Sequence, residues 1–186
     1  MNLGDHLPLL AIILPLLAAP VCVLAGRTGA AWLIALSSSV LSLAAAVALL
    51  QRVVQEGTVS YQLGGWAPPW GIELRVDLLG AYVLLIVCVI AALVIAYARR
   101  SVLREIETSR IPAFYAAILL VCAGLSGITV TGDAFNLFVF LEVSSLASYA
   151  LISMGHDRRA ISAAFQYLVM GSIGATFILI GIGFLY

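Results

Sequence analysis

The sequence predicts an all-α integral membrane protein with about six transmembrane helices and one β-hairpin outside the membrane. Of its 186 residues, 63% are hydrophobic and only 10% are charged, and the mean hydropathy is +1.15. Soluble domains carry about 25% charged residues. The formal net charge is zero, so charge gives no indication of a nucleic-acid partner. Residues 1–186 are therefore expected to form a single transmembrane domain.

Six stretches approach or exceed the roughly 20 apolar residues that a membrane-spanning helix needs. They cover residues 7–25, 30–50, 78–98, 112–130, 134–154 and 161–186. The first contains Pro15 and Pro20, which a transmembrane helix tolerates when neighbouring helices satisfy the freed backbone groups. The last reaches the end of the chain without a polar tail, which favours a truncated or split larger membrane protein.

One long polar connection, residues 51–77, lies between the second and third apolar stretches. Apolar and polar residues alternate over residues 59–63 and again over residues 72–77, and a Gly- and Pro-rich cluster separates these runs. Two runs of period two around such a cluster are typical of a β-hairpin. Residues 51–77 are thus predicted to be an extracytoplasmic hairpin loop.

The arginines predict how the chain is oriented in a cell membrane. All nine basic residues are arginines, and they fall in the connections between the apolar stretches. Arg52 and Arg75 lie on one side of the six spans. The other side carries Arg27, Arg99, Arg100, Arg104, Arg110, Arg158 and Arg159. By the positive-inside rule the richer side faces the cytoplasm, which places the N-terminus and the hairpin outside.

Glu142 lies near the middle of the fifth apolar stretch. Acidic side chains at such depth are costly, usually face the interior of a helix bundle, and mark ion or proton pathways. Helical steps of three and four lead from Glu142 to Ser145 and then to Ser148 or Tyr149, so one helix face would carry a carboxyl, hydroxyls and a phenol. The alternative is a neutral carboxyl that holds helices together and moves no proton.

We expect Glu142 to rest protonated in this chain. Loss of hydration disfavours the charged form of a carboxyl group, whereas a nearby cation would favour it. The chain contains no lysine, and every arginine lies in a connection. A serine hydroxyl or a water molecule would then be the hydrogen-bond partner of the carboxyl group.

Three other polar residues complete the candidate set. Asp133 is predicted to cap the fifth helix at its N-terminus. Gln166, inside the sixth stretch, is a candidate polar neighbour of Glu142, with a bridging water where their heights differ. His156, between the fifth and sixth stretches, is either an ordinary surface residue or a site of proton uptake, because histidine titrates near neutral pH.

The sequence predicts no cofactor and no metal site in this chain. Cys22, Cys88 and Cys122 lie in three different apolar stretches without the close spacing of metal ligands, and they are expected to be small buried hydrophobic residues. No Cys cluster of an iron–sulfur site and no Gly-rich phosphate loop occurs. These absences favour an ion-transport subunit over an enzyme.

Several motifs together resemble the antiporter-like subunits of membrane complexes. They are Gly132 to Glu142, followed by Ser148-Tyr149, and then Ala163 to Leu168 with the Gly-rich helix after it. This family includes the MrpD subunits of Mrp-type monovalent cation/proton antiporters, related subunits of membrane-bound hydrogenases, and the N, M and L subunits of respiratory complex I. The segment from Leu63 to Trp66, leading to Asp77, is most similar to the MrpD branch.

The resemblance covers the whole chain but only the N-terminal part of such a subunit, less than half of it. It implies that Glu142 matches the family's helix 5 glutamate, which pairs with a lysine and tunes proton movement. Gln166 stands where many members carry the lysine of helix 6, and an amide cannot titrate. The implied function is a membrane subunit of a multisubunit Na⁺/proton antiporter, with other membrane subunits as partners.

Two alternatives remain open at the level of the sequence. The chain could be the ion-pumping arm of a redox-driven complex, a membrane-bound hydrogenase or an NADH:quinone oxidoreductase, with the redox chemistry in partner subunits. It could also be a scaffold that carries no ions.

Overall fold

The structure is a computed structural model that describes residues 6–66, 71–155 and 158–185. Its six long helices are α1 (Leu7–Ala25), α2 (Thr28–Glu56), α3 (Leu78–Glu105), α4 (Ile111–Val130), α5 (Ala134–Ser153) and α6 (Arg158–Leu185). Each is long and apolar enough to cross a membrane. The prediction of an all-α membrane protein with six spanning helices is therefore confirmed.

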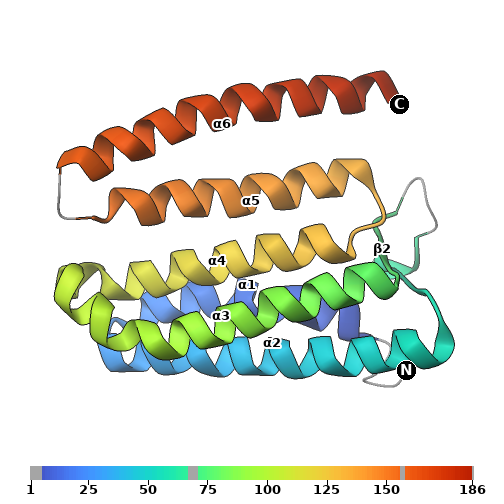
Figure 1. The fold of residues 1–186 in the computed structure, drawn as a ribbon, viewed down its shortest axis with the longest axis horizontal. Coiled ribbons are helices and arrows are strands. Elements are labelled where there is room, and N and C mark those ends of the chain that lie inside the picture. The colour runs from blue at the N-terminus through green and yellow to red at the C-terminus, as the bar shows by residue number, and fades with distance from the viewer. Residues whose placement is uncertain (1–5, 67–70, 156–157, 186) are drawn as a thin grey trace.

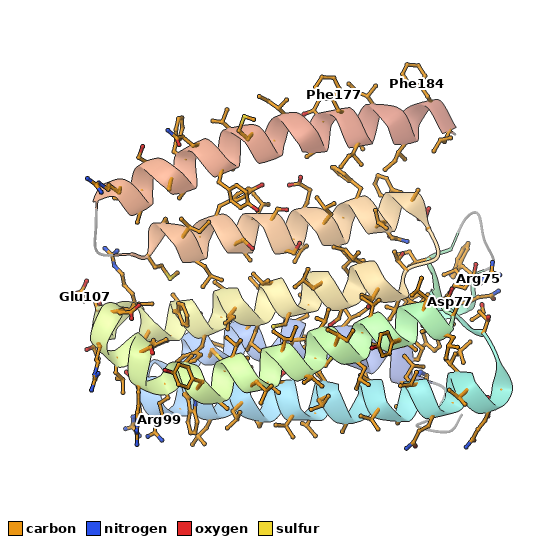
Figure 2. All side chains as sticks on the ribbon, in the orientation of Figure 1. Arg75, Asp77, Arg99, Glu107, Phe177 and Phe184 are labelled. Carbon is orange, nitrogen blue, oxygen red and sulfur yellow. The ribbon has the colours of Figure 1, made fainter. Side chains whose placement is uncertain are left out.

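The helices lie side by side and alternate in direction (Figure 1). Helices α1 to α4 form a compact bundle, α5 lies along α4, and α6 forms an outer layer on α5. Helix α1 continues through Pro15 and Pro20, as the sequence predicts. The alternation places Arg99 and Glu107 at one end of the molecule and Arg75 and Asp77 at the other (Figure 2).

Several helices extend beyond the apolar stretches that predicted them. Helix α2 ends at Glu56 instead of residue 50, α3 ends at Glu105 instead of residue 98, and α6 begins at Arg158 instead of residue 161. Apolar composition marks only the part of a helix inside the bilayer, and polar turns can continue it outside. In α2 the added turn contains an ion pair, with Arg52 Nε 2.7 Å from Glu56 Oε2.

The predicted β-hairpin is confirmed, although it begins after α2 rather than at residue 51. Strands β1 (Val59–Gln62) and β2 (Glu73–Val76) pair antiparallel, with Val59 opposite Val76 and Gln62 opposite Glu73. Leu74 and Val76 are buried and belong to a hydrophobic cluster with residues of α1 to α4. The hairpin therefore closes one end of the helix bundle.

Helix α5 docks on α4 through glycines. A Cβ atom at Gly124 would lie 2.7 Å from Ser144 Cβ, and one at Gly127 would overlap the Phe140 ring. Small residues let transmembrane helices approach closely. This contact fixes the side of α5 that faces the bundle, and thereby the direction in which Glu142 points.

Candidate functional site

Helix α5 begins at Asp133, as predicted. The Asp133 carboxylate accepts hydrogen bonds from the backbone amides of Phe135 at 3.2 Å and Asn136 at 3.4 Å. The first amides of a helix lack partners within it, and a capping carboxylate satisfies them. The cap thus defines where α5 starts and, with it, the depth of every side chain along the helix.

The face of α5 opposite α4 is directed towards α6. The Tyr149 ring centroid lies 5.0 Å from that of Tyr167, with the rings nearly perpendicular, and the Tyr149 hydroxyl end lies against Gly171. At 3.6 residues per turn, Glu142 is only about 20° around the helix from Tyr149 but about 160° from Ser144. Glu142 and Ser145 therefore share the α6-facing side of α5 with Tyr149.

Glu142 lies at mid-depth in this helix pair. It is about 12 Å along the axis from the start of α5, and it is partly buried. Tyr149 lies against Gly171, and Glu142 precedes Tyr149 by seven residues. Because α5 and α6 run antiparallel, a step back along α5 corresponds to a step forward along α6. The carboxyl group is therefore level with the part of α6 that follows Gly171. Within the described residues Glu142 has neither a hydrogen bond nor an ion pair.

Two serines near Glu142 in the sequence, on other sides of α5, bind the backbone of their own helix. Ser144 Oγ donates to the carbonyl of Leu141 at 2.9 Å, and Ser148 Oγ donates to the carbonyl of Ser144 at 2.8 Å. Such bonds inside the helix leave the hydroxyl oxygens available as acceptors. A direct bond from a serine to the Glu142 carboxyl is not formed among the described residues, so water is the remaining predicted partner.

The structure does not bring Gln166 together with Glu142. Gln166 is exposed, whereas Ala164 and Ala175 are buried. Gln166 follows Ala164 by two residues, or about 200° around α6, so it occupies the side of α6 that faces away from α5. It is also about 10–15 Å from Glu142 along the helix axis. Helical period alone did not reveal this, because it does not say which face meets the neighbour.

His156, the remaining candidate, lies outside the described residues. Of the cysteines, Cys22 and Cys88 are buried and Cys122 is partly buried, and all three are free thiols. Their position agrees with the prediction of small buried hydrophobic residues. Among residues 6–66, 71–155 and 158–185, no group of three or more His, Cys, Asp or Glu could hold a metal ion.

Six spanning helices, with an acid at mid-depth between the last two, define a multi-pass membrane protein. Residues 131–186, which cover α5 and α6, match the family model described as NADH:quinone oxidoreductase/Mrp antiporter, TM. The chain belongs to this family of antiporter-like subunits.

The chain is similar to relatives of both kinds named in that family description, oxidoreductase subunits and antiporter subunits. It is 42% identical over 185 residues to the N subunit of the NADH-quinone oxidoreductase of Desulforudis audaxviator, covering 97% of this chain and 36% of the relative. It is 36% identical over 138 residues to the D subunit of the Na(+)/H(+) antiporter of Bacillus subtilis, covering 74% of this chain and 27% of that protein. The chain spans about a third of the length of such relatives.

The fold is similar to that of a chain in a solved Mrp complex from Dietzia sp. DQ12-45-1b. The TM-score is 0.84 at 31% sequence identity, over 97% of this chain and 34% of the other. The predicted resemblance to antiporter-like subunits, over only part of their length, is thereby confirmed.

Proposed function

We propose that this chain is part of a proton-conducting subunit of a multisubunit Na⁺/proton antiporter in the cell membrane, and that Glu142 carries the proton. The observation that carries this proposal is the position of Glu142. It lies at mid-depth on the α6-facing side of α5, partly buried, and without an ion pair among the described residues. A carboxyl in this setting can change its charge when a proton arrives or leaves.

A cation beside Glu142 would affect the protonation of its carboxyl group. In an apolar environment the ionised carboxyl loses its hydration, and an arginine or lysine at the same depth would compensate for that loss. No such partner is present in the described part of the chain. The proton is therefore expected to be bound at rest and to be released when the surroundings change.

Ser145 and Tyr149 are proposed to support the proton path. They follow Glu142 along the same face of α5, at about 4.5 Å and 10 Å further along the axis. A hydroxyl group can donate one hydrogen bond and accept others, so the two side chains can order water between α5 and α6. The path would lead to the end of α5 where His156 is proposed to take up protons.

Gln166 is proposed to act on the other side of α6. Its exposed position away from α5 suits a contact with whatever packs on the outer face of α6. An amide supplies hydrogen bonds there but no titratable charge. We propose that other membrane subunits are partners, that the N-terminus lies outside, and that the chain transports ions without catalysing a redox reaction itself.

A second candidate is the ion-pumping subunit of a redox-driven complex. The observation that favours it is the 42% identity to a protein named as the N subunit of an NADH-quinone oxidoreductase. In that case the redox centres would reside in partner subunits. Iron or flavin that co-purifies with this chain in stoichiometric amounts would select this candidate, and small Mrp-like subunits without them would select the antiporter.

The substitution Glu142→Gln tests the proposed role of the carboxyl group. The amide keeps the shape of the side chain but cannot bind and release a proton, so we expect proton-coupled Na⁺ flux in vesicles containing the assembled complex to fall about tenfold or more. The matched control is Glu107→Gln in the α3–α4 connection, where the side chain is exposed. Both variants should assemble in normal amounts.

Equal flux in the two variants would contradict the proposal and favour the scaffold alternative. A loss of assembly in Glu142→Gln alone would instead indicate the structural role of a carboxyl that holds helices together.

A further inference from the structure

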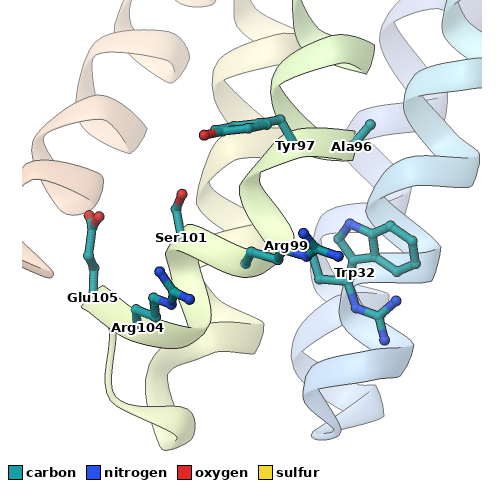
Figure 3. Close-up of a pocket in the computed structure, with 8 residues that line it drawn as sticks. Trp32, Ala96, Tyr97, Arg99, Ser101, Arg104 and Glu105 are labelled. Carbon is teal, nitrogen blue, oxygen red and sulfur yellow. The ribbon is translucent and has the colours of Figure 1, made fainter.

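A basic pocket lies at the α3 end that the arginines predict to be cytoplasmic. Its cavity of about 610 Å³ is lined by Trp32 of α2 and by residues of the last turns of α3. Figure 3 shows Arg99 beside Trp32, with Arg104 further along α3. Arg99, Arg100 and Arg104 all line this pocket.

Trp32 and Arg99 give the pocket a defined wall. Trp32 Nε1 donates a hydrogen bond to the carbonyl of Ile95 at 3.1 Å, which ties α2 to α3. The guanidinium carbon of Arg99 lies 4.5 Å from the Trp32 ring centroid, within the range of a cation–π contact. Arg99 is thus held in place over an aromatic ring that is itself fixed.

The side chains that line the pocket carry a net positive charge. Three arginines face one carboxylate, Glu105, in the lining. None of the three arginines forms an ion pair with a described residue, whereas Arg110 nearby lies 3.6 Å from Glu107. Arginine matches phosphate with two parallel hydrogen bonds, so the pocket is suited to a phosphate group.

An apolar groove continues from the basic pocket towards the membrane. It shares Tyr97, Ser101 and Glu105 with the pocket, and its other lining residues include Leu93, Val94 and Phe114. Leu93 and Val94 are exposed in the spanning part of α3. A free phosphate ion would leave this groove empty, whereas a molecule with a phosphate and an acyl chain would fill both parts.

We propose that this surface binds one anionic phospholipid. Arg99, Arg100 and Arg104 contact the phosphate, Ser101 donates a hydrogen bond to it, and an acyl chain lies along the groove of Leu93, Val94 and Phe114. The cytoplasmic leaflet is rich in anionic lipid, and basic pockets between transmembrane helices bind such headgroups. The lipid would stabilise the α2–α3 contact at this end of the bundle.

Trp32 provides the readout for the test. The chain contains three tryptophans, so Trp66→Phe and Trp70→Phe leave Trp32 as the fluorophore. The full chain is reconstituted in phosphatidylcholine vesicles with an increasing fraction of phosphatidylglycerol that carries brominated acyl chains. We expect saturable quenching of Trp32 at low mole fraction, and much weaker quenching by brominated phosphatidylcholine.

Paired charge variants separate the site from general attraction. In Arg100→Gln/Arg104→Gln, half-maximal quenching should need about tenfold more phosphatidylglycerol, while Arg99 still covers Trp32. The control Arg27→Gln/Arg110→Gln removes the same charge on the same side, outside the pocket, and should behave as the parent chain. Helix content by circular dichroism should be equal in all variants.

Three results would overturn the proposal. Equal weakening in the two double variants would indicate surface potential only. Equal quenching by both brominated lipids would indicate unselective lipid contact. Full competition by soluble glycerol phosphate would indicate a phosphate site without an acyl chain.

Discussion

Helices α4 and α6 differ in how far the molecule covers them. Of the most apolar 18-residue window, 50% of the residues are buried in α4 and 11% in α6. Helix α4 is packed against α1, α3 and α5, whereas α6 lies along α5 and exposes large side chains such as Phe177 and Phe184 (Figure 2). The mid-depth acid lies on the side of α5 that faces the sparsely covered α6.

The two regions also differ in where their acidic side chains lie. The acids of α2 and α3 lie at helix ends, at Glu56, Asp77 and Glu105, where water or an ion pair can satisfy them. Glu142 lies between α5 and α6, and α6 is the helix that the rest of the molecule covers least. Regions with few buried apolar contacts open at lower free energy, and we propose that this lets water and a changing partner reach the carboxyl group.

The largest expected difference in stability is at the glycines of the two regions. In Gly127→Ala the new methyl group would overlap the Phe140 ring, so we expect the free energy of unfolding to fall by about 1–3 kcal/mol. In Gly174→Ala the methyl group meets nothing within 4 Å, and the change should stay within about 0.5 kcal/mol. Unfolding in mixed detergent micelles measures both.

Comparable losses in the two glycine variants would contradict the difference in packing between α4 and α6. Such losses would mean that α6 is packed as closely as α4 in the micelles.

A smaller effect is expected at two serines inside the bundle of α1 to α4. Ser39 and Ser42 of α2 line one small cavity beside Pro15. Ser39 Oγ donates to the Leu36 carbonyl at 2.8 Å, but Ser42 Oγ is buried without a partner among the described residues. Ser39→Ala should cost about 0.5–1 kcal/mol, and Ser42→Ala should be neutral or slightly stabilising, because it removes a desolvated group.

The same unfolding assay measures both serine variants. A clear loss in Ser42→Ala would show that its hydroxyl has a bound water as partner, and the cavity would then count as a polar site.

Much of this structure could be predicted from the sequence, for physical reasons. Long apolar stretches and strict alternation predicted the six helices and the hairpin, and the type of residue at Asp133 predicted the cap. Helical spacing predicted that Glu142, Ser145 and Tyr149 share one face. These are local properties, set by the geometry of a single helix or strand.

Other features depend on how helices pack, and the sequence did not reveal them. Gln166 faces away from Glu142 because Ala164 and Ala175 take the side of α6 that meets α5. The contact of Arg99 with Trp32 joins residues 67 positions apart, and the sequence suggested only that the arginines set the orientation. The observed helix ends also lie beyond the predicted ones, because the polar turns that continue a helix lack the apolar residues on which the prediction depends.

We propose that Glu142 holds a proton at rest in the space between α5 and α6. Infrared difference spectroscopy of the full chain in vesicles at neutral pH, with Glu142→Gln as the reference, tests it directly. We predict a carbonyl band of a protonated carboxyl group that the substitution removes. Loss of carboxylate bands alone would show that Glu142 is ionised, and would contradict the claim.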